Sequence, residues 1–303
     1  MNPTISLNPI DDFNALTTYP FMVNALEAGT IVAVLAAVVG WYMVLRRQSF
    51  AGHTLSVMAF PGAAGAALAG LPTALGYYLA CGTAALFMGG ARGTHGLGAR
   101  GRGYGTETAT IATVQTVGLA AGYLFLSLNS AVLGDTETLL FGTFLGVSRG
   151  QVLTLLLVAI AALALVALAT RPLLLETIDP EGARARGLPV AALDLGFLLV
   201  LALAVAATSQ ITGALLVFAL LVAPPAAAQQ LTMRPGLGLV LSVVFALAVV
   251  WLGLGVAYFS IYPVGFYVTT FAFAVYLAAR LWHATARHRH RHRDGHRDGH
   301  RSV

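Results

Sequence analysis

Histidine side chains are the most numerous groups in the C-terminal tail that could bind a metal ion. Five of them lie within thirteen residues of the C-terminal tail RHRHRHRDGHRDGHR, at His288, His290, His292, His296 and His300. Neutral imidazole is a common ligand of zinc and related divalent ions, and the neighbouring aspartates could complete the coordination. The composition of the tail cannot form a packed core, so we expect it to be disordered without metal.

Two further groups lie inside apolar runs. Glu27 is in the first long apolar run, and His53 opens the second in FAGHTLSVMAFPG. An acid or histidine within a membrane span is by default a candidate for function, and imidazole binds zinc-like ions. The alternatives are that Glu27 is hydrated near the membrane surface and that His53 has a structural role. Gln115, and Gln229 with Gln230, are weaker candidates.

Several function classes are excluded by composition. The chain contains no lysine, so it cannot hold the phosphate-binding loop that needs a lysine after its glycines. If ATP drives its activity, the ATPase is a separate polypeptide. No Ser-His-Asp or paired-carboxylate pattern indicates an enzyme. The single cysteine, Cys81, lies in an apolar run and is expected to be a packing residue.

Nine apolar stretches must position these residues. With 58% hydrophobic and 10% charged residues, the composition indicates a polytopic membrane protein of the all-α class, a compact bundle of about nine helices. Two stretches, the second and the sixth, are short and suggest broken or re-entrant helices. The nine candidates are Phe21–Leu45, Leu55–Gly70, Pro72–Gly90, Thr106–Leu126, Val152–Thr170, Ala191–Thr208, Ile211–Gln229, Pro235–Phe259 and Pro263–Trp282.

Arginine alternates along the breaks between these stretches. Basic residues near span ends stay on the cytoplasmic side, so the chain is expected to start outside and end inside, with Arg149 the exception. The basic breaks follow the first, third, fifth, seventh and ninth stretches, at Arg46, Arg47, Arg92, Arg100, Arg102, Arg171, Arg184, Arg186, Arg234 and from Arg280 onward.

Charge and boundaries define three parts of the chain. The net charge of +5 belongs to the tail, which predicts contact with anionic lipid heads and no nucleic-acid surface. We therefore expect an extracytoplasmic arm over residues 1–20, a transmembrane domain over 21–283 and a disordered cytoplasmic tail over 284–303. The arm lacks a basic stretch before its first apolar run, so it is not read as a cleavable signal peptide.

The longest cytoplasmic break, ETIDPEGARARGLP, predicts a short surface helix that could dock on another protein. Its capping signals are an N-cap aspartate, a proline at the first position, an acid in the first turn and arginines in the last, and a glycine suited to a left-handed C-terminal position. These residues are Asp179, Pro180, Glu181, Arg184, Arg186 and Gly187.

Five segments together carry a family resemblance. They are VLRRQSFAGHTLSVMAFPGAA (Val44–Ala64), LLFGTFLGVSRGQ (Leu139–Gln151), DPEGARARGLPVAALD (Asp179–Asp194), TGALLVFALLVAPPAAAQQL (Thr212–Leu231) and YPVGFYV (Tyr262–Val268). In this order they resemble the ABC-3 type membrane permeases of bacterial zinc and manganese ABC importers. The resemblance covers nearly the whole bundle.

The resemblance implies a multi-pass permease of the bacterial inner membrane that forms a homodimeric pore. It implies two cytosolic ATP-binding subunits, an extracytoplasmic metal-binding protein that supplies the pore, and a divalent metal, zinc first, as substrate with no permanent cofactor. The Asp179–Leu188 helix would transmit ATPase closure. One departure affects the metal site: the family's usual aspartate and histidine in the second helix are here His53 and Val57.

Three alternatives to a free-ion importer stay open at this point. The same architecture could import a metal complex, which would need no ligands in the pore. The chain could instead be a metal-responsive sensor that signals through its tail. A proton-coupled carrier would need more acids or histidines at mid-membrane depth than Glu27 and His53.

Overall fold

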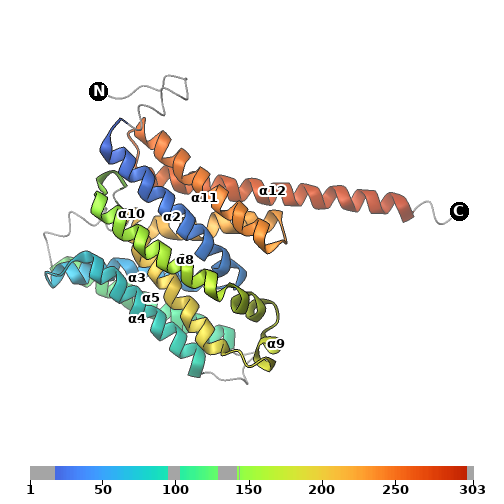
Figure 1. The fold of residues 1–303 in the computed structure, drawn as a ribbon, viewed down its shortest axis with the longest axis horizontal. Coiled ribbons are helices and arrows are strands. Elements are labelled where there is room, and N and C mark those ends of the chain that lie inside the picture. The colour runs from blue at the N-terminus through green and yellow to red at the C-terminus, as the bar shows by residue number, and fades with distance from the viewer. Residues whose placement is uncertain (1–17, 95–102, 129–141, 143, 299–303) are drawn as a thin grey trace.

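The structure is a computed structural model that describes residues 18–94, 103–128, 142 and 144–298, without the side chains of 91–94, 103–107, 145 and 286–298. Every regular element in these ranges is a helix (Figure 1). The elements are α2 (Pro20–Leu45), α3 (Ser49–Leu68), α4 (Thr73–Thr94), α5 (Gly103–Leu128), the 3₁₀ helix η1 (Phe144–Gly146), α8 (Arg149–Ile178), α9 (Pro180–Ala185), α10 (Val190–Leu231), α11 (Pro235–Tyr258) and α12 (Val264–Asp298).

The long element α10 is two helices joined at Gly213. Both of its ends contact the same end of α2: Asp194 accepts a hydrogen bond from Arg46, and Gln229 donates one to the Trp41 carbonyl oxygen at 3.0 Å. Between them, Gly213 has φ 74° and ψ 162°, a conformation essentially restricted to glycine. The chain therefore turns back at Gly213 and passes through the bundle twice within α10.

The other helices alternate in direction in the same way. We call the end of the bundle that carries Arg46, α9 and Arg234 the arginine end. α11 runs away from it beside α2, since Gly238 lies against Trp41 and Gly29 against Val250. With the two halves of α10 counted separately, the described helices make nine passages, as the nine apolar stretches predict.

Length and composition agree with a membrane location. Among the described residues, six helices are long and apolar enough to cross a membrane: α2, α5, α8, α10, α11 and α12. α3 and α4 are not among these six, and glycine, alanine and hydroxyl side chains make up much of both helices. These small residues allow close helix packing, which drives association in lipid; at one such contact Gly62 of α3 lies directly on Gly76 of α4.

Two sequence predictions about helix breaks are wrong. α3 is one continuous helix that begins at Ser49, since its polar first turns have partners inside the protein, such as the 3.0 Å hydrogen bond from Thr54 to Gln115. The stretch that starts at Ala191 is a full passage, and its break comes at Gly213 instead of Ser209–Gln210. The side chains of Thr208 and Gln210 there bond to their own helix, at the carbonyls of Ala204 (2.7 Å) and Ala206 (3.1 Å), so polarity alone does not end the helix.

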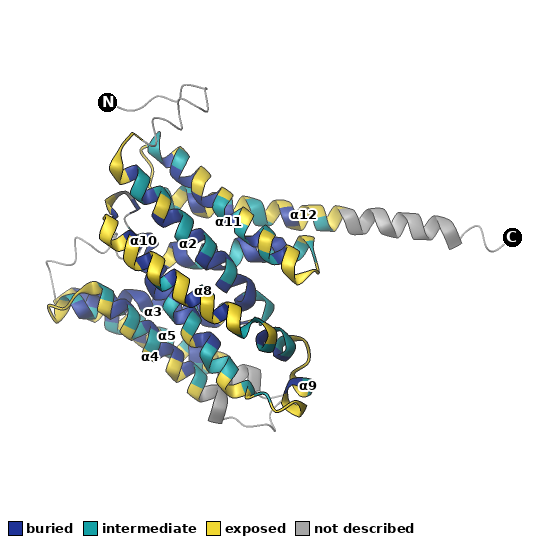
Figure 2. Ribbon diagram, viewed as in Figure 1, coloured by how far each residue is buried: buried dark blue, intermediate teal, exposed yellow. Residues whose placement is uncertain are grey.

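The helices differ strongly in how deeply they are buried (Figure 2). In the apolar stretch of α2, 67% of the residues are buried, against 17% for α12. α2 is thus the centre of the bundle, packed against both halves of α10, α8 and α11. The exposed apolar side chains of the outer helices, such as Leu157, Leu168 and Phe273, form the kind of surface that lipid covers.

The last helix is longer than the predicted ninth span. α12 continues past Trp282 to Asp298 and extends away from the bundle (Figure 1). The side chains after residue 285 lie outside the described part of the chain. The expected disorder of residues 284–303 without metal stays a prediction, as does the arm over residues 1–20, of which the structure describes only the last three.

Candidate functional site

His53 lies one turn into α3, near the arginine end, and three helices meet around its ring. Phe218 from the second half of α10 places its ring 4.7 Å from the imidazole, centroid to centroid. Gln115 from α5 places its amide nitrogen 3.4 Å from His53 Nε2. The same amide accepts a hydrogen bond from the Thr54 hydroxyl on its oxygen, at 3.0 Å. Thr54 thereby directs the amide nitrogen toward the imidazole.

The two ring nitrogens of His53 have different surroundings. With the amide donating, Nε2 is an acceptor and the ring is neutral. Nδ1 is buried and has no hydrogen-bond partner among the described residues. A buried polar atom without a partner is unusual and calls for an explanation, such as a ligand. Val57, one helical turn further on, is 8% exposed and offers only an aliphatic side chain.

Glu27 is not part of this site. It is an exposed residue of α2, and the segment from Glu27 to Leu45 spans roughly 27 Å at 1.5 Å per residue. Because α2 ends at the arginine end, where α3 begins, Glu27 and His53 lie toward opposite ends of the bundle. The structure therefore does not bring these two predicted ligands together within one chain.

The histidine-rich tail gives no geometry to test. His288, His290, His292 and His296 fall in the part of α12 without described side chains, and His300 lies outside the described residues. Within the described part of the chain, no group of three or more His, Cys, Asp and Glu side chains could hold a metal ion. Metal binding by the tail stays a prediction.

The predicted surface helix is confirmed as α9, a single six-residue helix at the arginine end. Its N-cap Asp179 accepts a hydrogen bond from the Gly182 backbone at 2.9 Å. At its other end Gly187 has φ 75°, and the amides of Gly187 and Leu188 donate to the carbonyls of Arg184 and Ala183. This is a Schellman motif, which satisfies the last carbonyls of a helix. Arg184, Arg186 and Glu181 are exposed.

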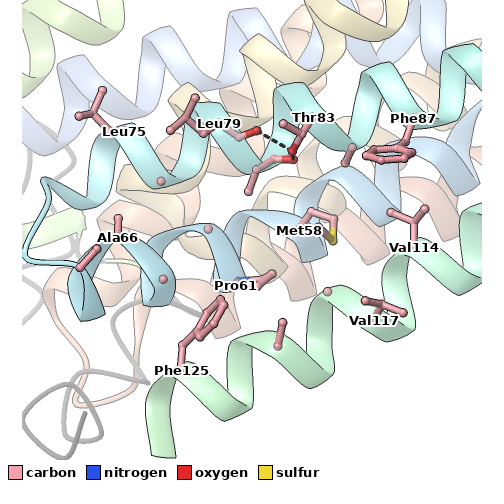
Figure 3. A pocket seen from close by; sticks show the side chains of 18 of the residues that line it. Met58, Pro61, Ala66, Leu75, Leu79, Thr83, Phe87, Val114, Val117 and Phe125 are labelled. Atoms are coloured by element: carbon pink, nitrogen blue, oxygen red, sulfur yellow. Dashed lines mark hydrogen bonds between the residues drawn. The ribbon is translucent and has the colours of Figure 1, made fainter. Parts of the chain in front are cut away.

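Two cavities lie outside the His53 site. One, of about 660 Å³, opens between α4 and α5 over α3 and is lined by apolar side chains such as Met58, Phe87 and Phe125 (Figure 3). Its hydroxyl groups are already used, as Thr83 donates to the Leu79 carbonyl of its own helix at 2.8 Å. This cavity contains no carboxylate or imidazole, so it is unsuited to a metal ion.

The other cavity, of about 530 Å³, lies at the end opposite the arginine end. Its lining includes the neutral polar residues Tyr78, Ser148, Gln151 and Gln210, from the first turns of α4 and α8 and the reversal of α10. Ser148 and Gln151 also form the capping box that starts α8. Hydroxyl and amide groups of this kind can line a route for a hydrated ion or a polar complex without holding it tightly.

Sequence reasoning found part of this site. It singled out His53 and ranked Gln115 low, and it passed over Phe218 and Thr54 as ordinary span residues. Phe218 is the only aromatic residue in the run TGALLVFALLVAPP, which could have drawn attention to it. Nothing in the spacing of Thr54 and Gln115, which are 61 residues apart, predicts their contact.

Comparison with known proteins shows which family the chain belongs to. The model of the ABC 3 transport family matches residues 18–283. The chain is 29% identical over 249 residues to the manganese transport system membrane protein MntC of Halalkalibacterium halodurans, covering 82% of each chain. It is 31% identical over 225 residues to the chelated iron transport system membrane protein YfeC of Yersinia pestis, covering 74% of each chain.

A solved structure agrees with the sequence match. PsaBC from Streptococcus pneumoniae, determined in complex with Fab, resembles this fold with a TM-score of 0.76 and 25% identity, over 89% of this chain and 94% of that chain. The chain belongs to the ABC 3 transport family and is a membrane permease subunit of a metal ABC importer, a multi-pass protein of the bacterial inner membrane.

Proposed function

We propose that this permease imports a divalent transition metal, zinc in the first place, and that His53 is a ligand on its path. The observation that carries the proposal is the half-buried imidazole whose Nδ1 has no partner among the described residues, while Gln115 holds Nε2. With Gln115 donating to Nε2, the ring proton is on Nδ1, so a metal ion could bind at Nδ1 only if this proton moves to Nε2 and the Gln115 amide flips to accept it. Alternatively, the ion could bind directly at Nε2 if the Gln115 amide nitrogen rotates away. In the second case the Gln115 amide oxygen would turn toward the ion.

The donor set favours some metals over others. Imidazole suits zinc, iron, copper and nickel, whereas manganese prefers carboxylate, carbonyl and water oxygens. Around His53 the described side chains are an amide, a hydroxyl and an aromatic ring, with no carboxylate. This chemistry supports zinc or ferrous iron ahead of manganese, although relatives of the chain are named for manganese and chelated iron.

A second candidate is the import of a metal complex through the same pore. It is supported by the lack of a three-residue ligand group in the described part of the chain and by the neutral lining of the cavity opposite the arginine end. A metal that arrives already coordinated needs contacts of shape and hydrogen bonding, which Phe218, Gln115 and Thr54 can offer.

Two features of the chain, the absence of lysine and the exposed helix α9, support a partnership with a separate ATPase. Because the sequence has no lysine for a phosphate-binding loop, ATP would be hydrolysed by a separate cytosolic subunit. That subunit would dock on α9, whose charged side chains are exposed. We further propose that two copies of the permease form the pore, that an extracytoplasmic metal-binding protein supplies it, and that the chain starts outside and ends inside.

The test is uptake of zinc, iron and manganese into vesicles that contain the permease, its ATPase and the binding protein. His53→Ala should lower uptake of the preferred metal by roughly tenfold or more, as loss of groups around a metal site commonly does. His283→Ala is the matched control, because this histidine lies on the outer helix α12 and should leave uptake unchanged. If His53→Ala has no effect on any free ion, His53 is not a metal ligand. Uptake of a chelate by the same vesicles would then support the second candidate.

A further inference from the structure

A buried arginine lies at the turn between α2 and α3. Arg46 is the C-cap of α2, and Gln48 is the N-cap of α3. The side chain of Arg46 is only 5% exposed, and Gln48 is buried as well. A guanidinium remains charged at any physiological pH, so a buried one needs anionic or hydrogen-bonding partners.

The partners of Arg46 come from both sides of α9. Glu176, near the end of α8, accepts from both terminal nitrogens of Arg46, at 3.0 and 3.3 Å. Asp194, near the start of α10, accepts from Arg46 and from the Gln48 amide, the latter at 3.2 Å. The ring of Phe197 lies 5.2 Å from the guanidinium carbon. α9 is thus held between two carboxylates that share one arginine.

The network also leads toward the proposed metal ligand. Arg46 and Gln48 are the first and last residues of the three-residue turn between α2 and α3, and His53 lies about one helical turn into α3. A displacement of α9 would move the ends of α8 and α10 and, through Glu176 and Asp194, the start of α3. Bidentate pairing fixes direction as well as distance, so these contacts can transmit a shift instead of absorbing it.

Two buried atoms of the network have no partners of their own in the described part of the chain. Arg46 Nε and Gln48 Oε1 are buried and without hydrogen-bond partners among the described residues. A polar network that is only partly satisfied is costly to keep. A rotation of either carboxylate around Arg46 would give Nε a partner at the expense of a terminal nitrogen. Because such a rotation exchanges one hydrogen bond for another and gains none, it does not favour breaking the contacts that link the two flanks of α9 to the α2–α3 turn.

We propose that Arg46, with Glu176, Asp194 and Gln48, is the positioning network that couples movement of α9 to α3 and hence to His53. The proposal rests on the proposed docking of an ATPase at α9. Arg46 touches neither substrate nor nucleotide in this scheme. Its role is to keep the α2–α3 turn and the two flanks of α9 moving as one unit.

The first test is the number of metal ions transported per ATP hydrolysed, with the reconstituted importer. Arg46→Gln should lower this ratio by roughly five- to tenfold, within the range for coupling between distant sites, while ATP hydrolysis continues without its dependence on metal. If Arg46→Gln does not fold, Asp194→Asn is a milder variant. Asp194 is partly exposed, and asparagine keeps one side-chain oxygen that can accept a hydrogen bond from Arg46. Arg47→Gln, at the exposed neighbouring arginine, is the matched control and should keep the wild-type ratio.

The second test measures the movement itself. Spin labels at Ile178→Cys, directly before the α9 N-cap, and at Phe50→Cys on α3, both exposed positions, should keep one separation in all nucleotide states of the otherwise wild-type importer. In Arg46→Gln or Asp194→Asn the separation should change with ATP. The proposal is overturned if ATP hydrolysis and metal transport fall in proportion in the variants and the distance between the two spin labels does not change with ATP. If the wild-type importer transports none of the tested metals, the proposed function fails, and the label distances still decide whether the network couples α9 to α3.

Discussion

At the scale of single residues, close backbone approach decides which side chains this bundle tolerates. At Gly40 the backbone of α2 lies against the Leu221 carbonyl of the second half of α10, and a Cβ there would overlap that oxygen. The neighbour is main chain and cannot rotate away. Packing in lipid depends on such approaches between small residues, because the hydrophobic effect does not drive helices together there.

Gly40→Ala should therefore loosen the core of the bundle. Forcing an extra carbon into a packed interior costs about 1–3 kcal/mol, so the unfolding midpoint of the detergent-solubilised permease should fall measurably. Gly82→Ala on α4 is the control, since a Cβ there meets nothing within 4 Å, and it should leave the midpoint unchanged or raise it. Equal midpoints for both variants would show that α2 and α10 do not pack this closely.

At the scale of elements, α9 is too short to be stable by itself. A helix of six residues is far below the length at which isolated helices form in water, so its end caps and its flanks must hold it. The aspartate cap and the glycine at φ 75° satisfy its terminal backbone groups. The Arg46 network fixes the two helices on either side of it.

The C-terminal cap of α9 can be tested by itself. Gly187→Val should strain the left-handed position by about 1–2 kcal/mol, and strain is the only cause, because a Cβ there meets nothing within 4 Å. Gly187→Asn should behave like wild type, as asparagine tolerates this conformation. We expect the valine variant alone to lose metal-dependent ATP hydrolysis and affinity for the ATPase. If the two variants bind and stimulate the ATPase equally, the shape of this cap does not matter for docking.

The sequence predicts the elements better than their contacts. The number of passages, the caps of α9 and the candidate His53 all follow from local patterns of arginine, glycine and polarity. The reversal of α10 could not be placed from polarity, since Thr208 and Thr212 bond to their own helix. The Arg46 network joins residues 130 and 148 positions apart. In the sequence, Arg46 indicates only the cytoplasmic side, because no local pattern shows which acids it meets.

At the scale of the whole molecule, the bundle separates two chemically different ends. The arginine end carries α9, the Arg46 network and the turn before α11. The opposite end carries the first turns of α4 and α8, the Gly213 reversal and the neutral polar cavity. His53 lies closer to the arginine end. A substrate that enters at the cavity would therefore reach the imidazole late in its passage, near the end where α9 is presented.

This arrangement makes a prediction about sidedness. Arginine near span ends stays on the cytoplasmic side, so the arginine end should face the cytoplasm and the α11–α12 turn the outside. Ile261→Cys in that turn and Met233→Cys before α11 are suitable probes, as these side chains are 84% and 95% exposed. Cys81 is buried and should contribute little background. In intact cells whose outer membrane admits the reagent, a membrane-impermeant maleimide should label position 261, and position 233 only after the inner membrane is opened. Labelling of position 233 in intact cells would reverse the topology and, with it, the proposed docking of a cytosolic ATPase on α9.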